Sequence, residues 1–260
     1  MPVNTQAPTR TVVLLGASNL TLGWQPIVKV LRSLVPQPLD LRVAFGMGRS
    51  YVGWSGFWFR RLPGIPDCGL WSNLPGQITL PPLVLITDLG NDLGYGHHPK
   101  VILQGVEKCV ETLRSWRPDV QIVMTGPPLQ ALHSMKQFRF LAARTVLFPH
   151  CRMTLSDVRQ RSEELENEAS LYAQKAGIAY TMPELEWYGW DPIHVLPKFR
   201  DLAFRRYFSH WPDVSCPAQP VTSTVERIRL PITASRKLFG VPVTTNQPSR
   251  HGAELRVSAW

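Results

Sequence analysis

The chain has 260 residues, of which 44% are hydrophobic and 18% are charged, so it is long enough and apolar enough to bury a core. This composition excludes a disordered chain, a collagen-like repeat and a small disulfide-stapled fold. No apolar run approaches the roughly 20 residues of a membrane-spanning helix, and the first residues lack the basic and apolar regions of a signal peptide. We therefore expect a soluble, cytoplasmic protein.

The net charge of +9 favours an acidic partner, a class that includes nucleic acid, an anionic membrane surface and an anionic substrate. The positive residues are spread along the chain, with pairs such as Arg60-Arg61 and Arg205-Arg206 but no cluster typical of a nucleic-acid arm. The prediction is a generally basic surface without a specific nucleic-acid motif. The cysteines are widely spaced and are expected to be free thiols: Cys68, Cys109, Cys151 and Cys216.

Short apolar runs alternate with helical periodicity along most of the chain. In order, we expect a strand at 11–16, a helix at 24–34, strands at 40–45 and 83–89, a helix opened by Pro99 and reaching Trp116, a strand at 120–124, a helix from a capping box at Thr154 and Asp157 to Gly177, a short strand at 178–180 and a last helix at 198–208. Nearly continuous apolar strands between helices are typical of a parallel sheet covered on both faces. In such sheets the functional residues lie at the carboxyl ends of the strands.

The character of the sequence changes after Trp211. Residues 212–260 contain several prolines, show weak periodicity and are more basic than acidic. We expect a main domain over 1–211 and an extension over 212–260 that is draped over it or flexible.

Two of four segments at predicted strand ends offer a nucleophile and a backbone donor. The segment 16–20, Gly-Ala-Ser-Asn-Leu, places Ser18 at a strand-to-helix turn, where serine caps a helix or presents its Oγ as a nucleophile. It is not Gly-x-Ser-x-Gly, which disfavours the nucleophile elbow of the α/β-hydrolases. The segment 45–50, Phe-Gly-Met-Gly-Arg-Ser, is an ordinary tight turn or a loop whose backbone N–H points toward a ligand. It matches neither the dinucleotide fingerprint nor the phosphate-binding loop.

The other two segments offer an amide and an acid–base pair. In 89–92, Leu-Gly-Asn-Asp, the Asn91 side chain is able to donate to a developing oxyanion, although Asn and Asp also favour turns. In 191–194, Asp-Pro-Ile-His, the carboxylate of Asp191 stands three residues before His194. That spacing lets the carboxylate hold the imidazole Nδ1–H and leave Nε2 as general base, or forms a simple turn.

Each of the four segments occurs once, in this order, and with them the chain resembles the SGNH (GDSL-type) hydrolases, which are named for their Ser, Gly, Asn and His blocks. The resemblance spans residues 11–208 and implies a three-layer α/β/α sandwich of the flavodoxin-like type, with a mainly parallel sheet of about five strands. It implies that Ser18 is the nucleophile, that Asp191 and His194 complete the triad, and that Asn91 is the side-chain oxyanion donor.

The resemblance also implies a backbone oxyanion donor in the second block, which is Gly48 or, as the alternative, Gly46. Two positions depart from the family pattern. Ala17 stands where the first block usually has aspartate, and Gly90 directly precedes Asn91 where one residue usually separates them.

The expected function is hydrolysis of a small-molecule ester, a carboxylic ester, through an acyl-enzyme and without a metal or organic cofactor. Two alternatives remain. One is an acyltransferase that uses the same triad and passes the acyl group to an alcohol. The other is a non-catalytic binding protein on this fold.

Three further features have mainly structural interpretations. His97-His98 is expected to be an exposed turn before a helix rather than a pair of metal ligands. The aromatic residues within 51–59 are expected in the core, or else as a rim that binds an acyl chain or a sugar ring. The segment 127–152 is either a cap over the site or another packed helix.

Overall fold

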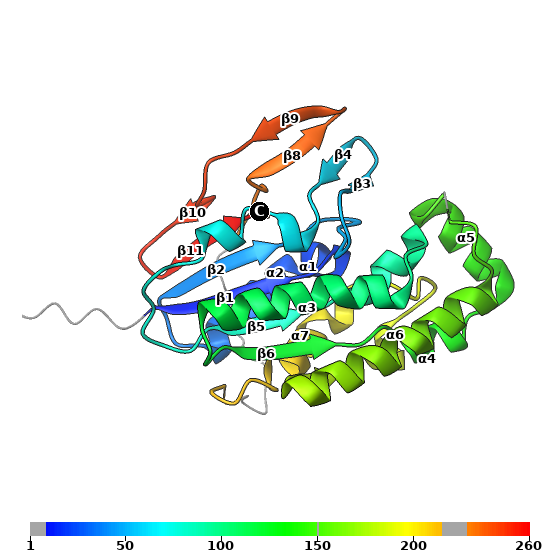
Figure 1. The fold of residues 1–260 in the computed structure, drawn as a ribbon, viewed down its shortest axis with the longest axis horizontal. Helices are drawn as coiled ribbons and strands as arrows, with labels where there is room; N and C mark the ends of the chain where they lie inside the picture. The colour runs from blue at the N-terminus through cyan, green and yellow to red at the C-terminus, as the bar shows by residue number, and fades with distance from the viewer. Residues whose placement is uncertain (1–8, 150, 215–227) are drawn as a thin grey trace, which may run out of the picture.

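A parallel sheet runs through the middle of the molecule, as a computed structural model shows for residues 9–149, 151–214 and 228–260, the parts of the chain that it describes (Figure 1). The strands of this sheet are β1 (Arg10–Leu15), β2 (Leu39–Ala44), β5 (Leu83–Ile86), β6 (Gln121–Thr125), β7 (Ala179–Thr181), β10 (Arg250–His251) and β11 (Leu255–Ala259). They lie in the order β10-β11-β2-β1-β5-β6-β7, and every pair is parallel except β10 with β11. In chain order, the first five strands of this sheet are β1, β2, β5, β6 and β7. Their spatial order is 2-1-3-4-5, as in flavodoxin-like folds, which confirms the predicted fold class.

Helices cover both faces of this sheet. The helices that pack on it are α2 (Trp24–Leu34), α3 (Pro99–Trp116), α6 (Leu155–Ala176) and α7 (Arg200–Phe208). Helices α2 and α7 share one apolar core with Val12 and Leu14 of β1, whereas α3 and α6 share the other with Val13 and Leu15. Because successive side chains of a strand point to opposite faces, β1 supplies both cores at once. The result is a three-layer α/β/α sandwich.

A second, antiparallel sheet lies beside the first (Figure 1). Its strands are β3 (Ser55–Phe57), β4 (Arg60–Leu62), β8 (Ser235–Leu238) and β9 (Val241–Thr244), in the order β3-β4-β8-β9. The remaining elements are α1 (Ser18–Leu22), α4 (Leu129–His133), α5 (Gln137–Leu147) and the 3-10 segments Ile65–Asp67, Trp71–Asn73, Leu89–Tyr95, Leu185–Trp187 and Pro197–Phe199. The second sheet therefore joins a hairpin that follows β2 to one from the end of the described chain.

Residues 228–260 of the extension contribute strands to both sheets. β11 pairs with β2 from Leu255 opposite Leu39 to Ala259 opposite Val43, so the main sheet has seven strands rather than about five. The sequence analysis did not predict this strand, whose partner β2 lies far earlier in the chain. The domain boundary at residue 211 stays a prediction.

Two smaller expectations concern the cysteines and the membrane. Cys68, Cys109 and Cys151 are free thiols, and Cys216 lies outside the described residues, as do residues 1–8. Within the described ranges, no helix is both long and apolar enough to span a bilayer.

Candidate active site

Three strand ends meet where the sequence places the candidate residues. Ser18 opens α1 directly after β1, Asn91 lies in the 3-10 segment that follows β5, and His194 lies in the loop that follows β7. Since these strands are parallel, their carboxyl ends share one edge of the sheet. We call residues 16–20 the nucleophile loop and residues 189–195 the histidine loop.

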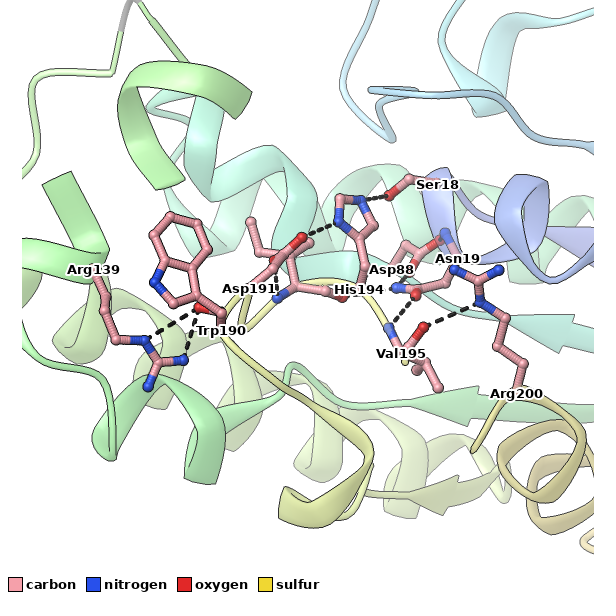
Figure 2. Close-up of polar contacts among 10 residues, drawn as sticks. Ser18, Asn19, Asp88, Arg139, Trp190, Asp191, His194, Val195 and Arg200 are labelled. Carbon is pink, nitrogen blue, oxygen red and sulfur yellow. Dashed lines mark hydrogen bonds and ion pairs between the residues drawn. The ribbon is translucent and has the colours of Figure 1, made fainter. Parts of the chain in front are cut away.

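Ser18, His194 and Asp191 form one chain of hydrogen bonds (Figure 2). His194 Nε2 is 2.9 Å from Ser18 Oγ, and His194 Nδ1 is hydrogen-bonded to Asp191 Oδ2. The other carboxylate oxygen of Asp191 accepts the backbone N–H of Ile193 at 2.8 Å. Burial alone would raise the pKa of Asp191, but the hydrogen bond and charge of His194 and the backbone N–H donors outweigh it and lower that pKa. The carboxylate is therefore held ionised beside the imidazole.

Asp88, at the end of β5, fixes the nucleophile loop. Its Oδ2 accepts the backbone N–H groups of Ala17 at 2.7 Å and Asn19 at 3.2 Å, the two residues that flank Ser18. Asp88 itself has a left-handed backbone with φ 65°, a conformation in which aspartate is enriched. Burial raises the pKa of Asp88, and the hydrogen bonds from Asn19 and Ala17 oppose that rise. The sequence analysis missed this residue because it counted Asp88 within the strand 83–89; a carboxylate closing an apolar strand was the signal.

Asn19 links the two loops. Its side-chain Nδ2 donates to Asp88 Oδ1 at 2.7 Å and to the carbonyl of Ile193 at 3.0 Å, while its Oδ1 accepts the N–H of Val195 at 2.9 Å (Figure 2). Ile193 and Val195 flank His194. One amide next to the serine therefore holds the backbone on both sides of the histidine.

Two arginines also hold the histidine loop. Arg139 of α5 donates to the carbonyls of Gly189 at 2.5 Å and Trp190 at 2.7 Å. Arg200 of α7 donates to the carbonyl of Val195 at 3.1 Å (Figure 2). Neither arginine was singled out in the sequence, because each donates to backbone carbonyls, which leave no motif in the sequence.

The predicted oxyanion donors have mixed placements. Asn91 is 7% exposed, lines the pocket beside Ser18 and donates an Nδ2–H to the carbonyl of Arg49 at 2.9 Å. A hydrogen bond with the Asn91 side chain also acts to lower the pKa of Tyr95, which burial raises to about 12. Gly48 has φ +69° and its carbonyl accepts the Tyr95 hydroxyl at 2.6 Å. Neither Gly46 nor Gly48 is among the residues that line this pocket. The oxyanion roles stay predictions.

Asp92 serves the loop rather than the pocket. It is fully buried, accepts the backbone N–H of Tyr51 at 2.8 Å and accepts the hydroxyl of Ser50. Burial raises the pKa of Asp92 to about 6, although both hydrogen bonds act to lower it. Its contacts tie the 3-10 segment to the loop after β2.

An apolar pocket opens beside Ser18. It encloses about 1040 Å³ with its open mouth included, and helices α4, α5 and α6 form its outer wall. The apolar side chains that line its outer part are Leu93, Leu132, Met135, Phe140, Ala143, Phe148 and Val158. Helices α4 and α5, which lie within the segment 127–152, therefore contribute side chains to the wall of this pocket.

The histidine pair lies elsewhere. The His98 side chain accepts the N–H of Lys100 at 3.4 Å and caps α3, so His98 sits at a turn before a helix. Among the described residues, no group of three or more His, Cys, Asp or Glu side chains is arranged to hold a metal ion.

No protein-family model and no curated protein matches this chain. Among solved structures, it is similar to a member of the lipolytic protein G-D-S-L family from Veillonella parvula, at 10% identity over 77% of this chain and 97% of that one, with a TM-score of 0.49. It is similar to an aryl esterase from M. smegmatis, at 16% identity over 76% and 97% of the two chains, with a TM-score of 0.49. A GDSL-like lipase from Bacteroides thetaiotaomicron has 11% identity over 77% and 86%, with a TM-score of 0.45. At this distance in sequence and structure, any conclusion about chemistry rests on the site itself.

Proposed function

We propose that this chain is an SGNH-type serine hydrolase that cleaves a carboxylic ester through an acyl-enzyme. The observation that carries the proposal is the chain of hydrogen bonds from Ser18 through His194 to Asp191. A nucleophilic hydroxyl, a base within hydrogen-bond reach and a carboxylate behind the base are the three groups that acyl transfer to serine requires.

The first half of the reaction forms the acyl-enzyme. His194 Nε2, 2.9 Å from Ser18 Oγ, accepts the hydroxyl proton as Oγ attacks the ester carbonyl. Asp191 keeps the proton on Nδ1 and stabilises the imidazolium that forms. The imidazolium then gives its Nε2 proton to the leaving alcohol. In the second half, His194 takes a proton from water as the water oxygen attacks the acyl carbonyl. The imidazolium then returns that proton to Ser18 Oγ as the acyl–Oγ bond breaks and the carboxylic acid leaves.

The developing oxyanion needs donors that are already in place. The Ser18 N–H is suited to this because the first N–H groups of a helix have no acceptor within it, and Ser18 opens α1. The side-chain amide of Asn91 and the backbone N–H of Gly48 complete the proposed set. The hydrogen bond from Asn91 to Arg49 supports its part, since it holds the amide in one orientation.

The pocket under α4 and α5 supports an ester with a hydrocarbon acyl group. Its wall is mainly aliphatic and aromatic, and burial of each methylene there contributes about 0.8 kcal/mol. An acyl chain of several carbons would gain most from such a wall, while a charged acyl group would lose its hydration.

The test is active-site labelling with a fluorophosphonate. We expect stoichiometric modification of Ser18, no labelling of Ser18→Ala, and unchanged labelling of the control Ser55→Ala, whose hydroxyl lies near the same loops without a partner. Modification at Ser50 or Ser55 with Ser18 untouched would contradict the proposal. A series of p-nitrophenyl esters from acetyl to octanoyl, with product analysis in the presence of an added alcohol, then measures chain preference and separates hydrolysis from acyl transfer.

A further inference from the structure

The second sheet ends in two aromatic turns. Two residues, Trp58 and Phe59, connect β3 to β4, and Phe239 with Gly240 connects β8 to β9. The side chains of Trp58, Phe59 and Phe239 are 85%, 52% and 80% exposed. We call these three residues the aromatic tip. The sequence analysis expected aromatic residues of this stretch in the core, and that holds for Tyr51 but not for Trp58 or Phe59.

The aromatic residues of the tip occupy turn positions whose backbone conformation does not favour bulky side chains. Trp58 has φ 56° and Phe239 has φ 50°, a conformation that two-residue hairpin turns normally give to glycine, asparagine or aspartate. A bulky side chain is an outlier there. The two turns also touch, because the rings of Phe59 and Phe239 stack with centroids 4.9 Å apart and the Phe239 N–H donates to the Phe59 carbonyl at 2.8 Å. Side chains that are both exposed and unfavourable for the turn point to a function outside the fold.

The charge around the aromatic tip has one sign. The two hairpins, 55–62 and 235–244, contain Arg60, Arg61, Arg236 and Lys237 and no Asp or Glu. Within the described part of the chain, none of these four cations takes part in an ion pair with a carboxylate. Lys237 instead lies 4.8 Å above the ring of Trp54, which is half exposed.

We propose that the aromatic tip inserts into the interfacial layer of a membrane that contains anionic lipids, with the four cations against the headgroups. Tryptophan and phenylalanine partition to this layer, and lysine and arginine beside it are attracted to negative headgroups. The charge of the two hairpins complements an anionic surface and matches no cationic or neutral partner. The docking does not depend on the proposed hydrolysis.

One side chain connects the second sheet to the loop after β2. The Tyr95 hydroxyl donates to the carbonyls of Gly48, at 2.6 Å, and of Gly56 in β3, at 3.4 Å. The hairpin that carries Trp58 and Phe59 is therefore attached to the segment that the sequence analysis identified as the second block.

The experiment is co-sedimentation of the full chain with vesicles of phosphatidylcholine alone or with phosphatidylglycerol added. We expect binding only with phosphatidylglycerol, and weaker binding as salt is raised. Trp58→Gly and Phe239→Asn each place a favoured residue in the strained turn, so we expect an unchanged or higher unfolding temperature together with about tenfold weaker binding. Arg61→Glu should weaken binding by about tenfold or more through its change of charge. Leu171→Ala, an exposed apolar residue of α6, is the matched control and should bind as the wild type does.

The other outcomes overturn the proposal. Equal binding to both vesicle types would show that anionic lipid is not required. Full binding by Trp58→Gly and Phe239→Asn would show that the aromatic tip does not contribute to binding. Absence of vesicle binding combined with a dimer that Trp58→Gly converts to a monomer in light scattering would assign the tip to a second copy of this chain. Activity on a soluble p-nitrophenyl ester, measured with the same variants, tests the proposed hydrolysis separately.

Discussion

The nucleophile loop and the histidine loop are held in different ways. The nucleophile loop continues from a buried strand, and the neighbouring strand end supplies Asp88 to fix the backbone around Ser18. The histidine loop is held by side chains from three helices, namely Asn19, Arg139 and Arg200. The sheet therefore positions the serine, while distant side chains bring the histidine to it. Variants of those side chains should separate catalysis from folding.

The largest effect on activity is expected from Ser18 and His194, where the two loops are in contact. Ser18→Ala and His194→Ala should each lower kcat/KM by about 10⁴–10⁶-fold, and the double variant should be no worse than either, because the residues act as one unit. Circular dichroism and thermal unfolding should change little. Steady-state kinetics on all three variants tests this expectation. If the losses of the two single variants multiply in the double variant, Ser18 and His194 do not act as one unit.

The next effect concerns Asn91, which belongs to neither loop. Asn91→Ala should lower kcat by about 10²–10³-fold with little change in KM, since an oxyanion donor acts only where charge develops. Asp92→Asn, one residue away, is the matched control and should cost stability rather than kcat. If Asn91→Ala keeps a kcat near that of the wild type, the oxyanion assignment is wrong, and the Gly90-Asn91 spacing is the first suspect.

A smaller effect on activity is expected from Asn19, which links the two loops. Asn19→Ala removes the hydrogen bonds to Ile193 and Val195 and should lower kcat by about 10²-fold through misplacement of His194. Arg139→Ala touches only one end of the histidine loop and should cost less. The rate of fluorophosphonate labelling at saturating reagent measures both. Equal losses for the two variants would argue against a special role for Asn19.

The smallest effect is the pH dependence of stability, which has opposite signs for two carboxylates. Asp92 has a raised pKa of about 6, so the folded state holds its proton longer than the unfolded state, and stability falls as pH rises from about 4 to about 6. The lowered pKa of Asp191 adds stability above the unfolded pKa that is lost as the solution is acidified. Urea unfolding between pH 3 and 7 should show Asp92→Asn losing the first trend and Asp191→Asn the second. A pH profile unchanged by Asp92→Asn would contradict this assignment.

The local sequence pattern was sufficient to predict an element whose structure depends mainly on its own residues. The capping box of Thr154 and Asp157 and the left-handed Gly177 bound α6 as expected, and the apolar strands predicted the five central strands. The local pattern failed to predict features that depend on a partner far along the chain. β11 joins the parallel sheet through β2, far earlier in the chain, and Asp88 matters because the nucleophile loop folds onto it. The order of Ser18, Asn91 and His194 was readable, but what holds them together was not.

The side-chain attachment of the histidine loop has a consequence for amide hydrogen exchange. The N–H of Ile193 is bound to the Asp191 carboxylate and the N–H of Val195 to the Asn19 amide, so neither amide is part of a sheet or helix ladder. Exchange of these two hydrogens requires only that these side-chain hydrogen bonds break, whereas exchange in β1 requires the sheet to open. The protection of Ile193 and Val195 therefore reports, without any substrate, the fraction of molecules in which the imidazole stands beside the serine.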